Sequence, residues 1–271
     1  TIYLTKIFKK YQGDIYFPRI GDNFRLVDVK KDLSAEENVK MEFRTYSREG
    51  KIHQEYQYLT FMQKLIEEGE ASDDRTGVGT KSIFGVQFKY DLSKNFPLMT
   101  TKRMYFKGIV EELLWFLRGS TNVKELQRKN VKIWDDNSSK EFLNKYGLYH
   151  LEEGDIGKTY GFLYRHFGAK YKNCLTNYDN CGYDQVRNAI HLLKSNPSNR
   201  RIIINLWCPP FEKQAALPPC LFCLQFRGYN GKLHCHAMIR SNDMCLGHPW
   251  NIGTAGLMTC IFAKLTNHVP G

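Results

Sequence analysis

Hydrophobic and polar residues alternate in short runs over the first fifty residues of the chain. The four runs are TIYLTKI, DIYFPRI, FRLVDVKKD and VKMEFRTYS, and Pro18 interrupts the second. Alternation with a period of two is typical of β-strands that bury one face. Because four short strands make a poor core alone, we expect this segment to be a piece of a larger β-rich domain.

Helical spacing of hydrophobic residues begins at about residue 53. EYQYLTFMQKLIEEGE, GIVEELLWFLRGSTN and VRNAIHLLKSNP each predict a helix, and Gly119 is a natural end for the second. LGHPWNIGTAGLMTCIFAKLTNHV predicts a late helix that is buried on most sides.

Three β-rich runs separate the last two of these helices: RRIIINLWCPP, CLFCLQFRGYN and GKLHCHAMIRS. Asn230-Gly231 predicts a tight turn between the second and the third. Strands and helices mix without regular βαβ alternation, so the order predicts the α+β fold class.

Length and composition limit the class of protein. The 271 residues, 42% of them hydrophobic, suit one large domain with a substantial core, or one domain plus a fragment. The sequence contains no stretch of about 18 uncharged apolar residues, so we expect no membrane span. Because the chain opens on Thr1 and stops at Pro270-Gly271 directly after a helical pattern, we expect segments to be missing at both ends.

Charge and cysteine content narrow the partners and the compartment. A net charge of +11 favours anionic partners such as nucleic acid, phosphorylated metabolites or polycarboxylates. The basic residues are spread out, which argues against a dedicated nucleic-acid surface. Eight cysteines without a secretory signal favour reduced thiols and a cytoplasmic location.

Cys220 is a candidate nucleophile because Pro218 and Pro219 fix the backbone ahead of it at the edge of a predicted sheet. The alternative is a buried core cysteine. Cys220 and Cys223 also form a C-x-x-C pair that could serve zinc or redox chemistry. The sequence has no second pair at zinc-finger spacing, and we expect no metal site.

Several basic and polar side chains suit a phosphate monoester. Arg75 lies in DDRTGVGT, Arg200 and Arg201 open a strand, and Arg240 precedes Ser241. Guanidinium groups beside hydroxyl groups offer forked, charged donors. A single arginine of this kind is more often a solvated surface charge, but the four together in a basic protein favour a phosphate monoester.

Glu112 lies within the apolar run IVEELLWFL. A buried carboxylate there would have a raised pKa and suit general acid–base catalysis. A helix-surface glutamate beside Glu111 is the alternative. Trp134, Tyr160 and Asn251 could stack on or hydrogen-bond a planar ring, or could be core and capping residues.

Eight ordered segments from Glu55 to Gly271 resemble thymidylate synthase. They are DDRTGVGT, FPLMTTKR, EELLWFLRGSTN, VKIWDDN, GFLYRHFGA, NPSNRRIII, ALPPC and RSNDMCLGHPWNI. Residues 1–50 resemble the closing strands of dihydrofolate reductase, and the order is similar to the bifunctional enzyme of protists and plants. The resemblance predicts a reductase remnant and linker over 1–50 and a C-terminally truncated synthase domain over 51–271.

The resemblance also implies a fold and a reaction. The fold would be a mixed β-sheet at a homodimer interface with covering helices. The enzyme would be a methyltransferase that converts dUMP to dTMP, with methylenetetrahydrofolate as donor of one carbon and hydride and dihydrofolate as product. Residues 1–50 lack the dinucleotide-binding and folate-binding segments of a reductase, so no reductase activity is expected.

Catalytic roles are implied for five residues. Cys220 matches the nucleophile that adds to carbon 6 of uracil, and Glu112 the carboxylate that manages protons through ordered water. Tyr160 resembles the tyrosine that helps to remove the proton from carbon 5. Asn251 matches the side chain that reads the uracil edge, and Asp243 the residue between pyrimidine and folate.

Binding roles follow in the same way. The phosphate ligands would be Arg75, Arg240 and Ser241, together with Arg200 and Arg201 lent by the other subunit of a homodimer. The folate contacts would be Ile133, Trp134, Asp243 and Gly247, with Lys102 near the glutamyl tail.

The sequence departs from the family pattern at three positions. Leu221 replaces a histidine after the nucleophile, Ile239 a glutamine and Tyr164 a tryptophan. The pair that binds the deoxyribose hydroxyl, and the residues that close over folate, would lie beyond Gly271, so we expect reduced turnover by this chain itself.

Three rival functions remain open. A deoxycytidylate hydroxymethylase shares the scaffold but has Asp where this chain has Asn251. A nucleic-acid-binding module would use the net charge. A truncated, inactive paralogue would serve only as a dimer partner.

Overall fold

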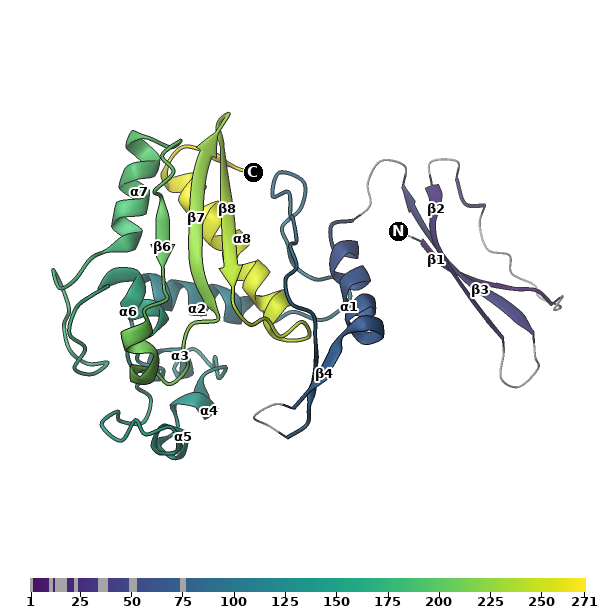
Figure 1. The fold of residues 1–271 in the computed structure, drawn as a ribbon. Coiled ribbons are helices and arrows are strands. Elements are labelled where there is room, and N and C mark those ends of the chain that lie inside the picture. The colour runs from purple at the N-terminus through teal and green to yellow at the C-terminus, as the bar shows by residue number, and fades with distance from the viewer. Residues whose placement is uncertain are drawn as a thin grey trace. The chain divides into compact units, whose positions relative to one another are not determined.

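The computed structural model describes residues 2–9, 12, 19–21, 24–33, 39–48, 53–73 and 77–271. The chain divides into two compact units, residues 1–89 and 90–271, and each is described by itself (Figure 1). The predicted strand DIYFPRI lies mostly outside the described residues.

The first unit opens with a three-stranded antiparallel sheet. Its strands are β1 (Ile2–Ile7), β2 (Phe24–Leu33) and β3 (Lys40–Arg48), in the order β1-β3-β2. The three corresponding alternating runs of the sequence are thus confirmed as strands. Nine of the ten residues of β2 are exposed, so this strand buries almost nothing within the sheet.

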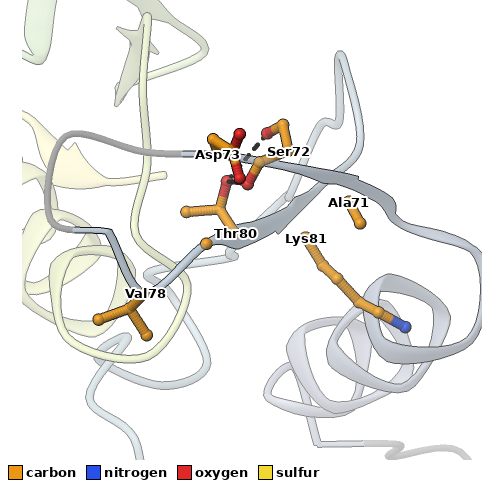
Figure 2. A pocket seen from close by; sticks show the side chains of 7 residues that line it. Ala71, Ser72, Asp73, Val78, Thr80 and Lys81 are labelled. Carbon is orange, nitrogen blue, oxygen red and sulfur yellow. Dashed lines mark hydrogen bonds between the residues drawn. The ribbon is translucent and has the colours of Figure 1, made fainter.

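A helix and a small hairpin complete the first unit. They are α1 (Tyr56–Glu68), β4 (Glu70–Ser72) and β5 (Thr80–Ser82). The hydroxyl groups of Ser72 and Thr80 share a hydrogen bond of 3.1 Å across the hairpin (Figure 2). Residues of both strands and of the turn line a hollow of about 570 Å³.

Helices fold around a central core in the second unit. Their bounds are α2 (Phe106–Leu117), α3 (Lys124–Gln127), α4 (Asp135–Ser138), α5 (Lys140–Lys145), α6 (Tyr160–Arg165), α7 (Gln185–Ser195), the 3₁₀ helix η1 (Pro209–Gln214) and α8 (Gly247–Leu265). Helix α2 packs against α6 and α8. Asp184 caps α7 by accepting the N–H of Arg187 at 2.8 Å, so this helix begins where its sequence offers an acceptor.

A four-stranded mixed sheet forms the centre of the second unit (Figure 1). It consists of β6 (Ile203–Asn205), β7 (Leu221–Tyr229), β8 (Lys232–Ile239) and β9 (Val269–Pro270), in that order. The first three strands are antiparallel, and β9 pairs with β8 in parallel. Helix α8 packs against β8.

The turn between β7 and β8 confirms the prediction made from Asn230-Gly231. Both residues have positive φ, 49° and 71°. Asparagine and glycine tolerate that conformation, and a turn of this kind matches the twist of a hairpin. The hairpin in turn brings the start of β7 beside the end of β8, where Leu221 pairs with Ile239.

The core of the second unit confirms that its helices and strands bury one contiguous apolar interior. Its largest fully buried side chains include Trp115, Tyr164, Phe162, Phe226 and Phe262. Strands and helices mix as the α+β prediction requires. No helix within the described part of the chain is long and apolar enough to cross a membrane.

Candidate active site

Cys220 lies immediately before β7, with its backbone held on both sides. Its carbonyl accepts the N–H of Arg240 at 2.9 Å, so the residue is anchored to the end of β8. A β-bulge between Leu221 and Cys223 then shifts the register of β7 against β8. Bulges redirect side chains at the ends of strands, and this one follows directly after the thiol.

Arg240 places a positive charge beside that thiol. Its Nη2 lies 3.9 Å from Cys220 Sγ. The guanidinium also donates to the carbonyl oxygens of Pro219, at 3.0 Å, and Pro218, at 3.1 Å, and lies 5.3 Å from the ring centre of Trp207. The carbonyl groups of the two prolines thus hold the cation beside the thiol.

Tyr160 contacts Cys220 from the other side. The backbone N–H of Cys220 donates to the phenol oxygen at 2.8 Å. The phenol ring stacks on Phe116 with a centroid distance of 4.8 Å. Burial, followed by the nearby Cys220, raises the pKa of Tyr160, so the phenol keeps its proton and can donate it in a hydrogen bond.

Glu112 is buried on α2 and accepts an indole hydrogen at each carboxylate oxygen. Trp134 Nε1 donates to Oε1 at 2.7 Å, and Trp250 Nε1 donates to Oε2 at 2.6 Å. Burial raises the pKa of Glu112 to about 7, against the lowering effect of the two indole hydrogen bonds. A carboxyl group with this pKa exchanges its proton readily near neutral pH. The buried alternative for Glu112 is therefore confirmed.

Asn251 lies in the first turns of α8. Its Nδ2 donates to Asn242 Oδ1 at 3.1 Å. Asp243, nearby in the same loop, accepts the backbone N–H groups of Cys245 and Leu246 at 2.7 and 2.8 Å. Its carboxylate therefore shapes the loop that leads into the helix.

Two other predicted folate contacts gather at the same loop. Lys102 Nζ donates to the carbonyl of Cys245 at 2.6 Å. A Cβ added to Gly247 would lie 3.4 Å from Asp243 Cβ and 3.8 Å from Asn251 Nδ2, so the glycine leaves room beside both side chains.

Trp134 and Ile133 differ in exposure. Trp134 is 7% exposed and bonded to Glu112, whereas Ile133 is 39% exposed. Of this adjacent pair, only Ile133 offers a substantial free surface.

Two predicted arginines are distant from Cys220 within the chain. Arg200 and Arg201 are exposed just before the start of β6. There the carbonyl of Arg200 accepts a hydrogen bond from Gln225 Nε2 at 3.2 Å. Gln225 lies five positions after Cys220 along an extended strand, a span of ~16 Å. Ser241 is exposed next to Arg240, and Arg75 lies outside the described residues.

Trp250, His248 and Asn242 lie within this site, although they were not predicted for it. Trp250 reaches Glu112 from a helix 138 positions along the chain. In their sequence segment, RSNDMCLGHPWNI, the family resemblance indicates only Arg240, Ser241, Asp243, Gly247 and Asn251. Polar residues such as Asn242 and His248 near the start of a helix that is otherwise apolar could have indicated a polar site there.

The state of the cysteines bears on the alternative in which Cys220 and Cys223 form a zinc-binding or redox pair. All eight cysteines are free. Within the described ranges, no group of three or more His, Cys, Asp or Glu side chains is arranged to hold a metal ion. The groups that the structure places beside Cys220 are the guanidinium of Arg240 and the phenol of Tyr160.

Comparison with known proteins gives the family. The family model described as thymidylate synthase matches residues 56–271. The chain belongs to the thymidylate synthase family. The match begins after the predicted boundary at residue 51, which stays a prediction.

Among the relatives of this thymidylate synthase family member are two bifunctional dihydrofolate reductase–thymidylate synthases. The protein of Paramecium tetraurelia is 46% identical over 98% of this chain and 59% of its own length. That of Zea mays is 47% identical over 90% of this chain and 46% of its own length. The chain thus spans about half the length of these curated relatives. The first alignment also extends into residues before 56.

A viral relative has a single-function name. The thymidylate synthase of Herpesvirus ateles is 48% identical over 81% of this chain and 76% of its own length. The resemblance read from the eight segments is thus confirmed at the level of the family.

Proposed function

We propose that the protein is a thymidylate synthase that methylates dUMP reductively to dTMP and releases dihydrofolate. The observation that carries the proposal is the set of groups around Cys220. A thiol with a guanidinium 3.9 Å away and a phenol on its own backbone N–H suits addition to an electron-poor ring.

Cys220 starts the reaction in this proposal. Its sulfur adds to carbon 6 of the uracil ring, and the electron pair moves towards carbon 5 and the oxygen on carbon 4. Carbon 5 thereby becomes nucleophilic. Arg240 lies beside the sulfur and is also a candidate ligand of the substrate phosphate, with Ser241 and Arg75.

Glu112 and Tyr160 handle protons. With a pKa of about 7, Glu112 can hold or release a proton at the pH of most cells, directly or through water. Tyr160 can hydrogen-bond the base that removes the proton from carbon 5. We assign Asn251 to the uracil edge because a side-chain amide offers a donor and an acceptor side by side.

The folate site fits the residues around the loop 242–247. Methylenetetrahydrofolate supplies the one-carbon unit and the hydride when bound. Lys102 offers a cation for its acidic tail, and Asp243 offers a carboxylate for a polar ring edge. Ile133 offers exposed apolar surface next to the mostly buried Trp134. The room beside Gly247 favours close approach of a flat ring.

We also propose a homodimer, with Arg200 and Arg201 completing the partner's phosphate site. Their exposed position away from Cys220 supports contribution to a second site. The alignment with the Paramecium protein before residue 56 supports fusion to an upstream reductase domain. Eight free cysteines support a reducing, cytoplasmic location.

Covalent trapping tests the proposal. The protein is incubated with 5-fluoro-dUMP and methylenetetrahydrofolate and analysed by intact-protein mass spectrometry. Fluorine at carbon 5 cannot leave as a proton, so the ternary adduct should accumulate in the wild type and be absent in Cys220→Ala. A folded wild-type protein that forms no adduct would contradict the proposed function.

Substrate choice separates the nearest rival. Asp at position 251 would accept a hydrogen bond from the exocyclic amine of cytosine but could not donate to the uracil oxygen. Asn251→Asp should weaken dUMP binding and strengthen dCMP binding. An unchanged preference would argue against Asn251 as the uracil reader.

A further inference from the structure

A row of four hydrogen-bonded polar side chains runs from Tyr90, through His248 and Asn242, to Asn251. Tyr90 Oη lies 3.1 Å from His248 Nε2, His248 Nδ1 lies 3.0 Å from Asn242 Nδ2, and Asn242 Oδ1 lies 3.1 Å from Asn251 Nδ2. His248, the histidine of this row, is buried, with 2% of its surface exposed. None of Tyr90, His248 and Asn242 has a role in the function proposed above.

The direction of the hydrogen bonds along this row is determined by the amide groups. Asn242 donates from Nδ2, so His248 Nδ1 must accept and His248 Nε2 carries the ring hydrogen towards Tyr90. Burial lowers the pKa of His248 to about 4, which keeps the ring neutral and Nδ1 able to accept. Asn242 is thereby left with Oδ1 facing Asn251.

The orientation of Asn242 fixes the orientation of Asn251 in its turn. Asn251 must present Nδ2, not its oxygen, to Asn242 Oδ1. That bond uses one of the two amide hydrogens, and the other hydrogen and the carbonyl oxygen remain for a ligand. A flip of the Asn251 amide would place two oxygens in contact and lose the hydrogen bond.

Fixing this amide matters for discrimination between pyrimidines. Uracil presents an N3–H donor beside the O4 acceptor, whereas cytosine presents an N3 acceptor beside an amino donor. An asparagine free to flip can match either edge, because its donor and acceptor exchange places. An asparagine held in one orientation matches only one edge.

We propose that Tyr90, His248 and Asn242 form a positioning relay that holds the Asn251 amide in the orientation that accepts uracil and rejects cytosine. The inference rests on the proposed function, in which Asn251 reads the pyrimidine. The three relay residues act through Asn251 and do not touch the substrate.

The test measures dissociation constants for dUMP and dCMP by titration calorimetry with the purified full-length protein. His248→Leu removes the acceptor for Asn242, and Asn242→Leu removes the acceptor for Asn251 at nearly constant shape. Each should lower the preference for dUMP over dCMP about tenfold, the effect of one lost hydrogen bond.

Asn242→Asp is the matched control. Its carboxylate still accepts from Asn251, and the neutral His248 ring can donate to it by moving its hydrogen to Nδ1. The preference for dUMP should therefore stay within about threefold of the wild type, which a merely structural role of position 242 would not predict. Tyr90→Phe removes the hydroxyl at the far end of the row from Asn251 and should have a smaller effect than His248→Leu.

The possible outcomes separate the relay from the proposed function. Thermal denaturation first checks that both leucine variants are folded. If the wild type prefers dUMP and the two folded variants keep that preference, the relay is overturned and the proposed function stands. If the wild type binds neither nucleotide, the proposed function fails and the relay with it. If His248→Leu does not fold, the contrast between Asn242→Leu and Asn242→Asp decides.

Discussion

The β1–β3 sheet and the β6–β9 sheet arise from similar sequence patterns but bury very different amounts of surface. In β2, nine of ten residues are exposed, including Leu26 at 45%. In β7, Leu224 and Phe226 are 0% and 1% exposed. Alternation therefore predicts a strand, but whether its apolar face is covered depends on the segments that pack against it.

Helices cover the second sheet, and this packing lets the sheet hold reactive side chains in fixed positions. Helix α8 packs against β8 and also against α2, which carries Glu112. The hairpin of β7 and β8 sets Cys220 beside Arg240. A rigid, buried framework holds catalytic groups within a few tenths of an ångström, and a solvated sheet offers no such support.

Among changes to the groups around the thiol, the largest expected effect is on proton transfer by Glu112. Glu112→Gln cannot exchange a proton and should lower the rate of dTMP formation about a thousandfold, within the range for loss of a general acid or base. The neighbouring Glu111→Gln is the matched control, because Glu111 makes an ion pair with Lys129 away from the indoles. Equal rates for the two variants would place the proton transfer elsewhere.

A pair of identical substitutions compares the two sheets directly. Leu224→Ala empties a fully buried site and should lower the free energy of unfolding by about 3 kcal/mol. Leu26→Ala removes the same atoms from a half-exposed site and should cost less than about 1 kcal/mol. Thermal or urea denaturation measures both, and similar losses would show that β2 is covered by a contact outside the described residues.

The smallest effect expected is on the titration of Glu112. Trp250→Phe keeps the ring but removes an N–H that stabilises the charged carboxylate, so the pKa of Glu112 should rise further above its usual value. Since a raised pKa keeps the proton on to higher pH, the limb of the pH–rate profile that reports Glu112 should move to higher pH.

Trp115→Phe is the control for this shift. The indole N–H of Trp115 is buried and has no hydrogen-bond partner in the described part of the chain. Its removal should leave the profile in place even if it lowers stability. A profile that moves equally in both variants would assign the shift to altered packing.

Local features of the site were predictable from sequence, whereas contacts between distant segments were not. The helix around Glu112, the strand after Cys220 and the Asn230-Gly231 turn each follow from neighbouring residues. The Trp250–Glu112 bond joins residues 138 positions apart, and no periodicity encodes it.

The row from Tyr90 to Asn251 was equally hidden from sequence patterns. Its members come from a loop before α2 and from the segment that enters α8. Hydrophobic periodicity does not indicate which polar side chains share a buried hydrogen bond. The exposure of β2 was hidden for the same reason, because burial is a property of the assembled fold.

We propose that the second sheet positions Cys220 as the nucleophile, and dTMP formation by cysteine variants tests this role most directly. Cys220→Ala should lower the rate by about 10⁴-fold or more, as expected for loss of a nucleophile. Cys181→Ala, at an exposed free cysteine, should leave the rate unchanged. A folded Cys220→Ala protein that still forms dTMP at the wild-type rate would contradict the account.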